Sequence, residues 1–302
     1  MTLTGIHLLI TYQCLLECDH CFVWSSPSLK WTMKLQNIRR LIQEAKTLGT
    51  VKWIYFEGGE PFLYYPIMVR MLREAAESGF QTGIVTNGYW ATSVEDATEW
   101  LIPVAKTGIT DLSISSDRYH GENTITEEAR NGVNAAKKLG IPVGIISVDV
   151  PSNLHQYPSE VEGAPVCKTE LMYRGRAVSK LLEAASRRPW TDFTKCPYED
   201  LANPQRVHVD PLGYVHVCQG ISIGNAWQRP FSEIIQSYNP SFHPIIRPLL
   251  EAGPVALVKK FHLPNEDTYA DACHLCYLAR LALRDRFPEY LAPAQMYGEA
   301  SP

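Results

Sequence analysis

The chain has 302 residues, of which 45% are hydrophobic and 20% charged, enough to bury one large core and a smaller one. Its formal net charge of -4 and its lack of long basic runs argue against nucleic acids and anionic membranes as partners. No apolar run is long enough to cross a bilayer, and residues 1–12 lack the cationic start of a secretory signal, so we expect a cytoplasmic protein. In that reducing compartment the eight cysteines favour metal ligation over disulfides.

Up to about residue 150, short strands rich in β-branched residues alternate with helices at a period of about thirty residues. The predicted strands cover residues 6–12, 51–56, 82–86, 111–115 and 143–148. The helices between them close on Gly49, Gly79, Gly108 and Gly140. Apolar residues recur at helical spacing over residues 35–48, which is the first predicted helix.

The later helices have recognisable starts. The predicted starts are Pro66 for the second helix, Thr92 with Glu95 or Ser93 with Asp96 for the third, and Thr124 with Glu127 for the fourth. Strands joined by such helices are parallel with right-handed crossovers, so the fold is of the α/β class and the sheet curls into a full or partial barrel. Residues that follow each strand then meet on one rim.

The rim carries a chemically distinctive cysteine group. Cys14, Cys18 and Cys21 follow the first strand, and a Gly-Gly-Glu-Pro stretch at residues 58–61 follows the second. Three thiolates supply three ligands, whereas structural zinc and ordinary iron–sulfur sites take four, so a cubane here keeps one iron open for a small molecule. A zinc site completed by His20, or three unligated thiols, are the alternatives.

These residues resemble the radical S-adenosylmethionine (SAM) superfamily. The resemblance implies that Cys14, Cys18 and Cys21 hold a 4Fe-4S cluster whose open iron chelates SAM, and that Gly58, Gly59 and Glu60 contact the SAM amino group. The family pattern has an aromatic residue before the third cysteine, whereas this chain has His20 there and Phe22 after it. Histidine at that position also resembles members that carry a second cluster.

The resemblance extends to residues on later strand ends. It implies SAM contacts from Phe22, Asn87, Ser113, Ser115 and Asp117, although serine and asparagine after a strand are equally turn formers. The weaker candidates for substrate contact are Arg118, Tyr119 and His120, for which an exposed polar loop is the alternative. No catalytic side chain is assigned beyond the cluster and the SAM site.

The middle of the chain breaks the periodicity. Residues 151–165 are predicted as a loop or a segment that caps the barrel. The stretch from Arg174 to Ala177 then opens a predicted helix to about Arg188. It resembles a Gly-Arg-Ala element found before auxiliary-cluster domains, and a solvated basic face is the alternative.

A second cysteine group follows residue 190, formed by Cys196, Cys218, Cys273 and Cys276. Residues 207–210 and 214–218 alternate around a turn like a β-hairpin, residues 231–238 look helical, and Asp271 is a plausible N-cap for a helix towards Phe287. This pattern resembles the twitch domain, a shorter relative of the SPASM extension, and implies an auxiliary 4Fe-4S cluster. A zinc knuckle is the alternative. Cys196 is the least certain ligand and Cys167 its substitute.

Together, these features predict three parts: a partial (β/α)6 TIM-like barrel at residues 1–190, a twitch-type domain of a small β-hairpin plus helix at 191–288, and a tail at 289–302. The resemblance implies reductive cleavage of SAM to a 5'-deoxyadenosyl radical, with an electron donor of flavodoxin or ferredoxin type. We expect hydrogen abstraction and net oxidation of a small molecule such as a sugar or cyclitol, by dehydrogenation or crosslinking. Peptide or protein modification and a non-catalytic zinc or iron–sulfur scaffold are the alternatives.

Overall fold

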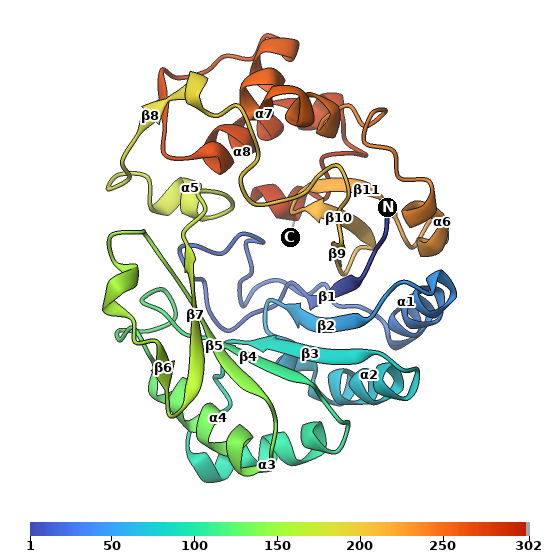
Figure 1. Ribbon diagram of the computed structural model, residues 1–302, viewed down its shortest axis with the longest axis vertical. Coiled ribbons are helices and arrows are strands. Elements are labelled where there is room, and N and C mark those ends of the chain that lie inside the picture. Colours follow the sequence, from blue (N-terminus) through green and yellow to red (C-terminus); the bar gives the residue numbers. More distant parts are fainter. Residues whose placement is uncertain (300–302) are drawn as a thin grey trace.

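The computed structural model describes residues 1–299 and shows a curved sheet flanked by helices (Figure 1). Five parallel strands pair in chain order, and a helix follows each of the first four. The strands are β1 (Gly5–Thr11), β2 (Trp53–Gly58), β3 (Gln81–Thr86), β4 (Asp111–Ser115) and β5 (Val143–Asp149). The helices are α1 (Leu35–Leu48), α2 (Tyr65–Glu77), α3 (Val94–Ala105) and α4 (Glu127–Lys138). The predicted alternation over the first half is confirmed.

One further strand extends the sheet where a loop was predicted. β7 (Ala164–Glu170) pairs in parallel with β5, and the two-residue strand β6 (Glu160–Val161) pairs with its start. The loop predicted over residues 151–165 is therefore confirmed only up to residue 159, after which the hairpin of β6 and β7 begins. β7 was missed because it lies near the sheet edge and most of its side chains are exposed, so its sequence shows no clear alternation. With β7 the sheet is the predicted partial barrel.

Two helix starts test the capping predictions. Ser93 caps α3, because its hydroxyl oxygen accepts a hydrogen bond from the Asp96 amide at 3.0 Å. The Thr124 cap was wrong: Thr126 caps α4 by accepting from the Ala129 amide. The Thr126 amide itself donates to the Ser116 hydroxyl at 2.9 Å, and this bond to the rim fixes where the helix begins.

The predicted helix from Arg174 to about Arg188 was also wrong in length. Only α5 (Ala177–Lys180) is helical, and the chain then turns into the short strand β8 (Arg188–Pro189), which pairs with β12 (Thr268–Tyr269). Gly175, just before α5, has φ of +59°, a left-handed conformation that suits glycine.

The C-terminal part continues the same sheet. β9 (Arg206–Val209) pairs in parallel with β1 and antiparallel with β10 (Tyr214–Cys218), which confirms the hairpin predicted over residues 207–218. β11 (Ile221–Asn225) adds a further antiparallel strand beside β10. A fully buried network joins the two parts: the Asp210 carboxylate accepts from the Tyr12 hydroxyl at 2.8 Å and lies 3.0 Å from His216 Nε2. Asp210 therefore fixes the hairpin to β1.

Three helices complete the C-terminal part, and the two longer ones gather at the end of the molecule away from α3 and α4 (Figure 1). They are α6 (Phe231–Gln236), α7 (Ile246–Phe261, kinked at Ala252 and Gly253) and α8 (Ala272–Leu283). The Asp271 side chain caps α8 as predicted. Short 3₁₀ turns cover Pro61–Tyr64, Leu154–Gln156, Trp190–Asp192, Arg284–Arg286 and Ala294–Tyr297. Within residues 1–299, no helix has the length and apolarity needed to span a membrane.

Candidate functional site

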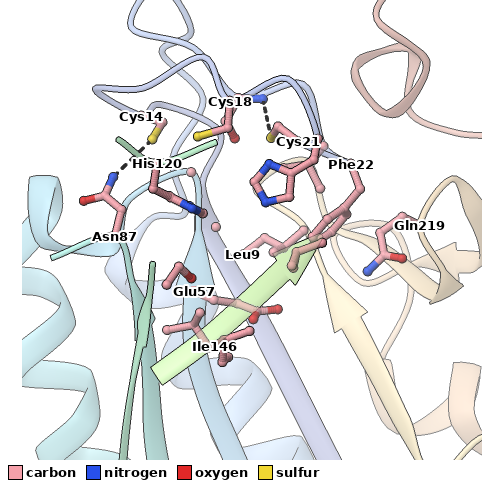
Figure 2. Close-up of a pocket in the computed structure, with 18 of the residues that line it drawn as sticks. Leu9, Cys14, Cys18, Cys21, Phe22, Glu57, Asn87, His120, Ile146 and Gln219 are labelled. Carbon is pink, nitrogen blue, oxygen red and sulfur yellow. Dashed lines mark hydrogen bonds between the residues drawn. The ribbon is translucent and has the colours of Figure 1, made fainter. Parts of the chain in front are cut away.

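A cavity of about 380 Å³ opens at the carboxyl ends of the parallel strands. Figure 2 shows Cys14, Cys18 and Cys21 together on one side of it, with Glu57 and Ile146 on the other. The structure brings most of the predicted site residues onto its wall: Cys14, Cys18, Cys21, Phe22, Gly58, Gly59, Asn87, Ser115, Asp117 and His120. The predicted convergence of strand ends thus produces a real cavity beside three thiols.

Hydrogen-bond donors point at the sulfur atoms of this group. The Leu16 amide donates to Cys14 Sγ at 3.4 Å, the Asn87 side chain donates to the same sulfur at 3.6 Å, and the Ser25 amide donates to Cys21 Sγ at 3.4 Å. Burial raises the pKa of the Cys14 thiol to about 12. Cys14 therefore needs a bound cation to be stable as a thiolate. Thiolates are the ligands that hold the iron of an iron–sulfur cluster.

The cysteine loop is held from outside by the segment that precedes α5. The Arg176 guanidinium donates to the Cys18 carbonyl at 2.8 Å and to the Ser25 carbonyl at 2.6 Å, while the Arg176 amide donates to the Cys21 carbonyl at 2.9 Å. A Cβ on Gly175 would lie 2.5 Å from the Phe22 Cα. Arg176 is buried, so the alternative of a solvated basic face was wrong, and this segment instead packs against the thiol loop.

The Gly-Gly-Glu stretch is divided between the cavity and the core. Gly58 and Gly59 line the cavity, and a Cβ on Gly59 would overlap the Gln13 carbonyl, so this stretch packs directly on the cysteine loop. Glu60 is fully buried, and its carboxylate accepts from the Phe62 amide at 3.0 Å, the Thr86 hydroxyl at 2.9 Å and the Asn87 amide at 2.8 Å. Burial raises the pKa of Glu60 to about 7. Its carboxylate ties β2 to β3 and is not on the cavity wall.

Asp117 organises the rim after β4. Its carboxylate accepts from the Tyr119 amide at 2.9 Å and the Val148 amide at 3.1 Å, and lies 2.8 Å from His120 Nδ1. Burial alone would raise the pKa of Asp117, but His120 outweighs burial and lowers it. Burial opposes the charge on His120, yet the hydrogen bond that His120 donates to Asp117 and then the neighbouring Cys18 thiol raise the His120 pKa to about 10. The two side chains form a charged pair beside the thiols.

The remaining predicted contacts lie off the cavity wall. The Ser113 hydroxyl donates to Asp111, and Arg118 pairs with Asp149 at 2.7 Å. The ring of Tyr119 stacks on His20 with centroids 4.7 Å apart. Tyr119 thus supports the cysteine loop, while Ser113 and Arg118 bind carboxylates of the barrel.

The second cysteine group assembles between the hairpin and α8. Cys218 ends β10, and Cys273 and Cys276 lie in the first turns of α8. Cys196 lies in the loop that precedes β9. Burial raises the pKa of Cys196, Cys273 and Cys276, the last to about 11, and the neighbouring thiols of the group add to this effect. Cys167 lies exposed on β7 instead.

Two arginines accompany the second group. Arg280 is fully buried and donates to the Cys276 and Gln219 carbonyls, and the Arg174 guanidinium lies 3.6 Å from Cys218 Sγ and over the Phe22 ring. Within the described residues neither arginine forms an ion pair with a carboxylate, and the cysteine thiols are among the groups that raise the pKa of both. Desolvated cations need a nearby anion, so a negatively charged thiolate-held group fits this site.

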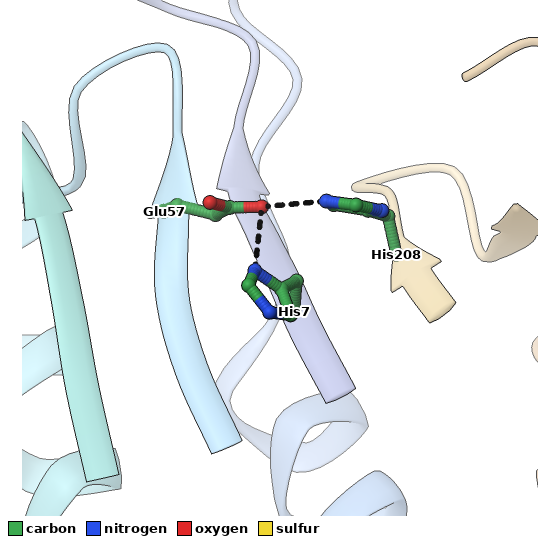
Figure 3. Close-up of side chains that lie close together, drawn as sticks. All are labelled: His7, Glu57 and His208. Atoms are coloured by element: carbon green, nitrogen blue, oxygen red, sulfur yellow. Dashed lines mark ion pairs between the residues drawn. The ribbon is translucent and has the colours of Figure 1, made fainter. Parts of the chain in front are cut away.

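Among the residues of the cavity wall that were not predicted, His7 on β1, Glu57 on β2 and His208 on β9 lie together (Figure 3). Glu57 Oε1 lies 3.4 Å from His7 Nδ1 and 3.2 Å from His208 Nε2. Burial lowers the pKa of His208 to about 4. His7 and Glu57 are ionisable residues in largely apolar strands, and that pattern is the signal that could have identified them, whereas His208 shares the short strand β9 with Arg206.

Comparison with known sequences agrees with this geometry. Residues 8–157 match the family model described as the radical SAM superfamily. The chain is 25% identical over 199 residues to the putative peptide biosynthesis protein YydG of Bacillus subtilis, covering 63% of this chain and 62% of that protein. It is 32% identical over 113 residues to a tungsten-containing aldehyde ferredoxin oxidoreductase cofactor-modifying protein of Pyrococcus furiosus, covering 37% and 30%. The chain thus spans less than two thirds of these relatives.

Solved structures share the fold at low sequence identity. The structure of anSMEcpe with bound AdoMet and a Cp18Cys peptide aligns over 95% of this chain and 97% of that one, with a TM-score of 0.54 and 13% identity. The structure of BtrN in complex with AdoMet and 2-DOIA aligns over 84% and 89%, with a TM-score of 0.51 and 17% identity. Both are radical SAM enzymes, and the chain has their overall architecture.

Proposed function

Because the chain belongs to the radical SAM superfamily through residues 8–157, we propose that it is an oxidising enzyme with two iron–sulfur clusters. In this proposal it abstracts hydrogen from a substrate in the barrel cavity and completes a net oxidation by electron transfer to an auxiliary 4Fe-4S cluster at the second cysteine group. The observation that carries the proposal is the pair of arginines, Arg174 and Arg280, which lack carboxylate partners in residues 1–299 and lie beside those thiols.

The superfamily binds a 4Fe-4S cluster and SAM, which when bound supply a 5'-deoxyadenosyl radical. In this chain Cys14, Cys18 and Cys21 would hold the cluster at the cavity mouth, where they offer three thiols and leave one iron free of protein ligands. Gly58, Gly59, Asn87 and Ser115 would face SAM, because they line the same cavity.

The second group would accept the electron that remains after hydrogen abstraction. Four cysteines would saturate an auxiliary 4Fe-4S cluster, which leaves it no open iron for substrate. Arg174 contacts both sites, since its guanidinium lies over the Phe22 ring at 5.2 Å and near Cys218 Sγ at 3.6 Å. A cation at this point favours the more negative, reduced state of the nearby cluster. An external donor of flavodoxin or ferredoxin type would reduce the first cluster.

We favour a small polar substrate, because His7, Glu57 and His208 place polar groups together on the otherwise largely apolar wall of the cavity of about 380 Å³. Peptide modification is the second candidate, and two observations on relatives support it. YydG is described as a putative peptide biosynthesis protein, and the anSMEcpe structure holds a peptide. A product lighter by two hydrogens, on a small molecule or on a peptide, separates the two candidates by mass spectrometry.

The direct test is anoxic reconstitution with iron and sulfide, followed by dithionite and SAM. We expect about eight iron atoms per chain, no zinc, and formation of 5'-deoxyadenosine. The Cys18→Ala variant should lose this cleavage, whereas Cys167→Ala, which removes an exposed thiol on β7, should retain it. Zinc in place of iron, or cleavage that persists in Cys18→Ala, would contradict the proposal.

A further inference from the structure

We propose that His7, Glu57 and His208 form a binding site for one divalent transition-metal ion on the wall of the cavity. Their three ligand atoms, His7 Nδ1, Glu57 Oε1 and His208 Nε2, all lie within 4.8 Å of one another (Figure 3). This site is distinct from both cysteine groups and uses a different class of ligand.

The sheet itself sets the position of the three side chains. β9, β1 and β2 are neighbours, and the register pairs His7 directly with His208. Glu57 pairs with Leu9, two residues further along β1, so its side chain lies on the same face of the sheet as His7. The Tyr55 ring stacks on His7 with centroids 4.8 Å apart and an interplanar angle of 8°, which limits rotation of the imidazole. The donors are therefore held by strands, not by loops.

The distances between the donor atoms fit a shared ion. Ligands at about 2.1 Å from a metal lie roughly 3.0 to 3.4 Å apart in octahedral or tetrahedral geometry. The observed separations from Glu57 Oε1 are 3.4 Å to His7 Nδ1 and 3.2 Å to His208 Nε2. Both distances from the carboxylate oxygen thus match the spacing that a single ion requires, and the two ring nitrogens lie within 4.8 Å of each other.

Two of these atoms also lack other partners. His7 Nδ1 and Glu57 Oε1 are buried, and neither has a hydrogen-bond partner of acceptable geometry. A bound ion would satisfy both at once, which removes the cost of leaving polar atoms unpaired. A second group, His20 with Asp117 and His120, differs, because both carboxylate oxygens of Asp117 already accept hydrogen bonds from backbone amides.

Two imidazoles and one carboxylate suit zinc, iron(II) or manganese(II) and leave further coordination positions open. Since the three residues line the cavity, those positions face the space that a substrate would enter. A bound ion could hold an oxygen or nitrogen donor of the substrate and lower the pKa of a coordinated hydroxyl. This role rests on the proposed function, whereas metal binding itself does not.

The test uses the protein with both iron–sulfur sites filled, so that the cysteines cannot take up the added metal. After anoxic incubation with Zn²⁺ and desalting, elemental analysis should give one zinc per chain alongside about eight iron atoms. In the His7→Asn/His208→Asn double variant we expect zinc affinity to fall at least 100-fold with iron unchanged. The matched control is His155→Asn, which removes an exposed histidine far along the chain.

Several outcomes would overturn the metal site. Wild-type protein with full iron but no retained zinc would do so, as would equal zinc binding by the double variant; the three side chains would then be an ion-pair cluster only. If the double variant loses iron through misfolding, Glu57→Gln is the replacement, because it keeps the size of the side chain. Formation of 5'-deoxyadenosine should survive in His155→Asn. Failure of iron incorporation or SAM cleavage in the wild type contradicts the proposed function instead.

Discussion

The two cysteine groups have the same ligand atoms but different electrostatic surroundings. The first group lies beside the charged pair Asp117 and His120 and receives hydrogen bonds from neutral donors, namely amides and Asn87. The second lies beside Arg174 and Arg280, which have no carboxylate partner within the described residues. The first site therefore has open space beside its thiols, whereas the second has two cations beside its thiols.

The two groups also differ in how they are fixed. The first is a loop, tied down by side chains distant in sequence: Arg176 binds two of its carbonyls, and Gln295 near the carboxyl end donates to the Val23 and Trp24 carbonyls. The second uses regular elements, since Cys218 ends a strand and Cys273 and Cys276 lie on α8. The geometry of the first group should therefore depend on the hydrogen bonds from Arg176 and Gln295, and that of the second on the stability of α7 and α8.

Removing one cysteine from each group should separate the roles of the two groups. Cys276→Ala removes a ligand of the second group only, so iron should fall from about eight to about four atoms per chain while 5'-deoxyadenosine is still formed. Cys18→Ala should show the opposite pattern, with the second cluster retained and SAM cleavage lost. Iron analysis and chromatography of the nucleoside products measure both. Loss of SAM cleavage in Cys276→Ala, with four irons retained, would show that the sites are not separable.

The packing of Gly175 against the cysteine loop should contribute to the stability of the first group. Gly175→Ala combines a left-handed backbone with a Cβ placed 2.5 Å from the Phe22 Cα, so we expect destabilisation on the order of 3–4 kcal/mol and poor iron retention at the first site. Gly140→Ala is the matched control. Its φ of +69° gives the same backbone cost, about 1–2 kcal/mol, but its Cβ would meet nothing within 4 Å. Thermal unfolding of both variants measures the difference, and equal losses would mean that the contact with the loop is unimportant.

The sequence predicted the barrel half of the molecule better than the connections. β4 and α1 have the predicted bounds, because alternating strands and amphipathic helices follow from local periodicity. β7 and the packing of Arg176 could not be predicted in this way, because both depend on partners distant in sequence. The spacing of Cys14, Cys18 and Cys21 in one loop was sufficient to predict that they lie together, whereas His7, Glu57 and His208 meet only because β9 pairs with β1. Long-range strand pairing is what a single sequence does not reveal.

Acid should destabilise the start of α7 through His243. Burial lowers the pKa of His243 to about 4, while its Nδ1 accepts from the Ile245 and Ile246 amides at the start of α7, which packs on α8. A folded pKa below the unfolded value of about 6.5 means that this stabilisation is present above pH 6.5 and is lost as the pH falls towards 4. We expect a loss of about 2–3 kcal/mol across this window.

The matched variant is His243→Asn, whose side-chain oxygen can still accept from the helix amides but does not titrate. It should be less stable at pH 7, because it loses the bond from the ring to the Ser222 carbonyl, yet its stability should change less between pH 6.5 and pH 4. Denaturant titrations at several pH values measure this slope. An unchanged slope would show that His243 does not cause the acid sensitivity.

The smallest effect tests the electrostatic contrast itself. Arg174→Gln keeps much of the side-chain length but removes a charge 3.6 Å from Cys218 Sγ, so the more negative, reduced state of the second cluster loses stabilisation. At an effective dielectric constant of about 20, a unit charge roughly 10 Å from an electron spread over the cluster contributes on the order of 1–2 kcal/mol, and its loss lowers the reduction potential by roughly 40–90 mV for one electron. The first cluster should shift less, because Arg174 meets its loop through the Phe22 ring and not through a thiol.

Arg187→Gln, which removes a more exposed cation paired with Glu266, controls for general charge. Redox titrations followed by electron paramagnetic resonance can resolve the two potentials, and equal shifts in both clusters would mean that Arg174 acts as a diffuse surface charge and that the contrast between the sites lies elsewhere.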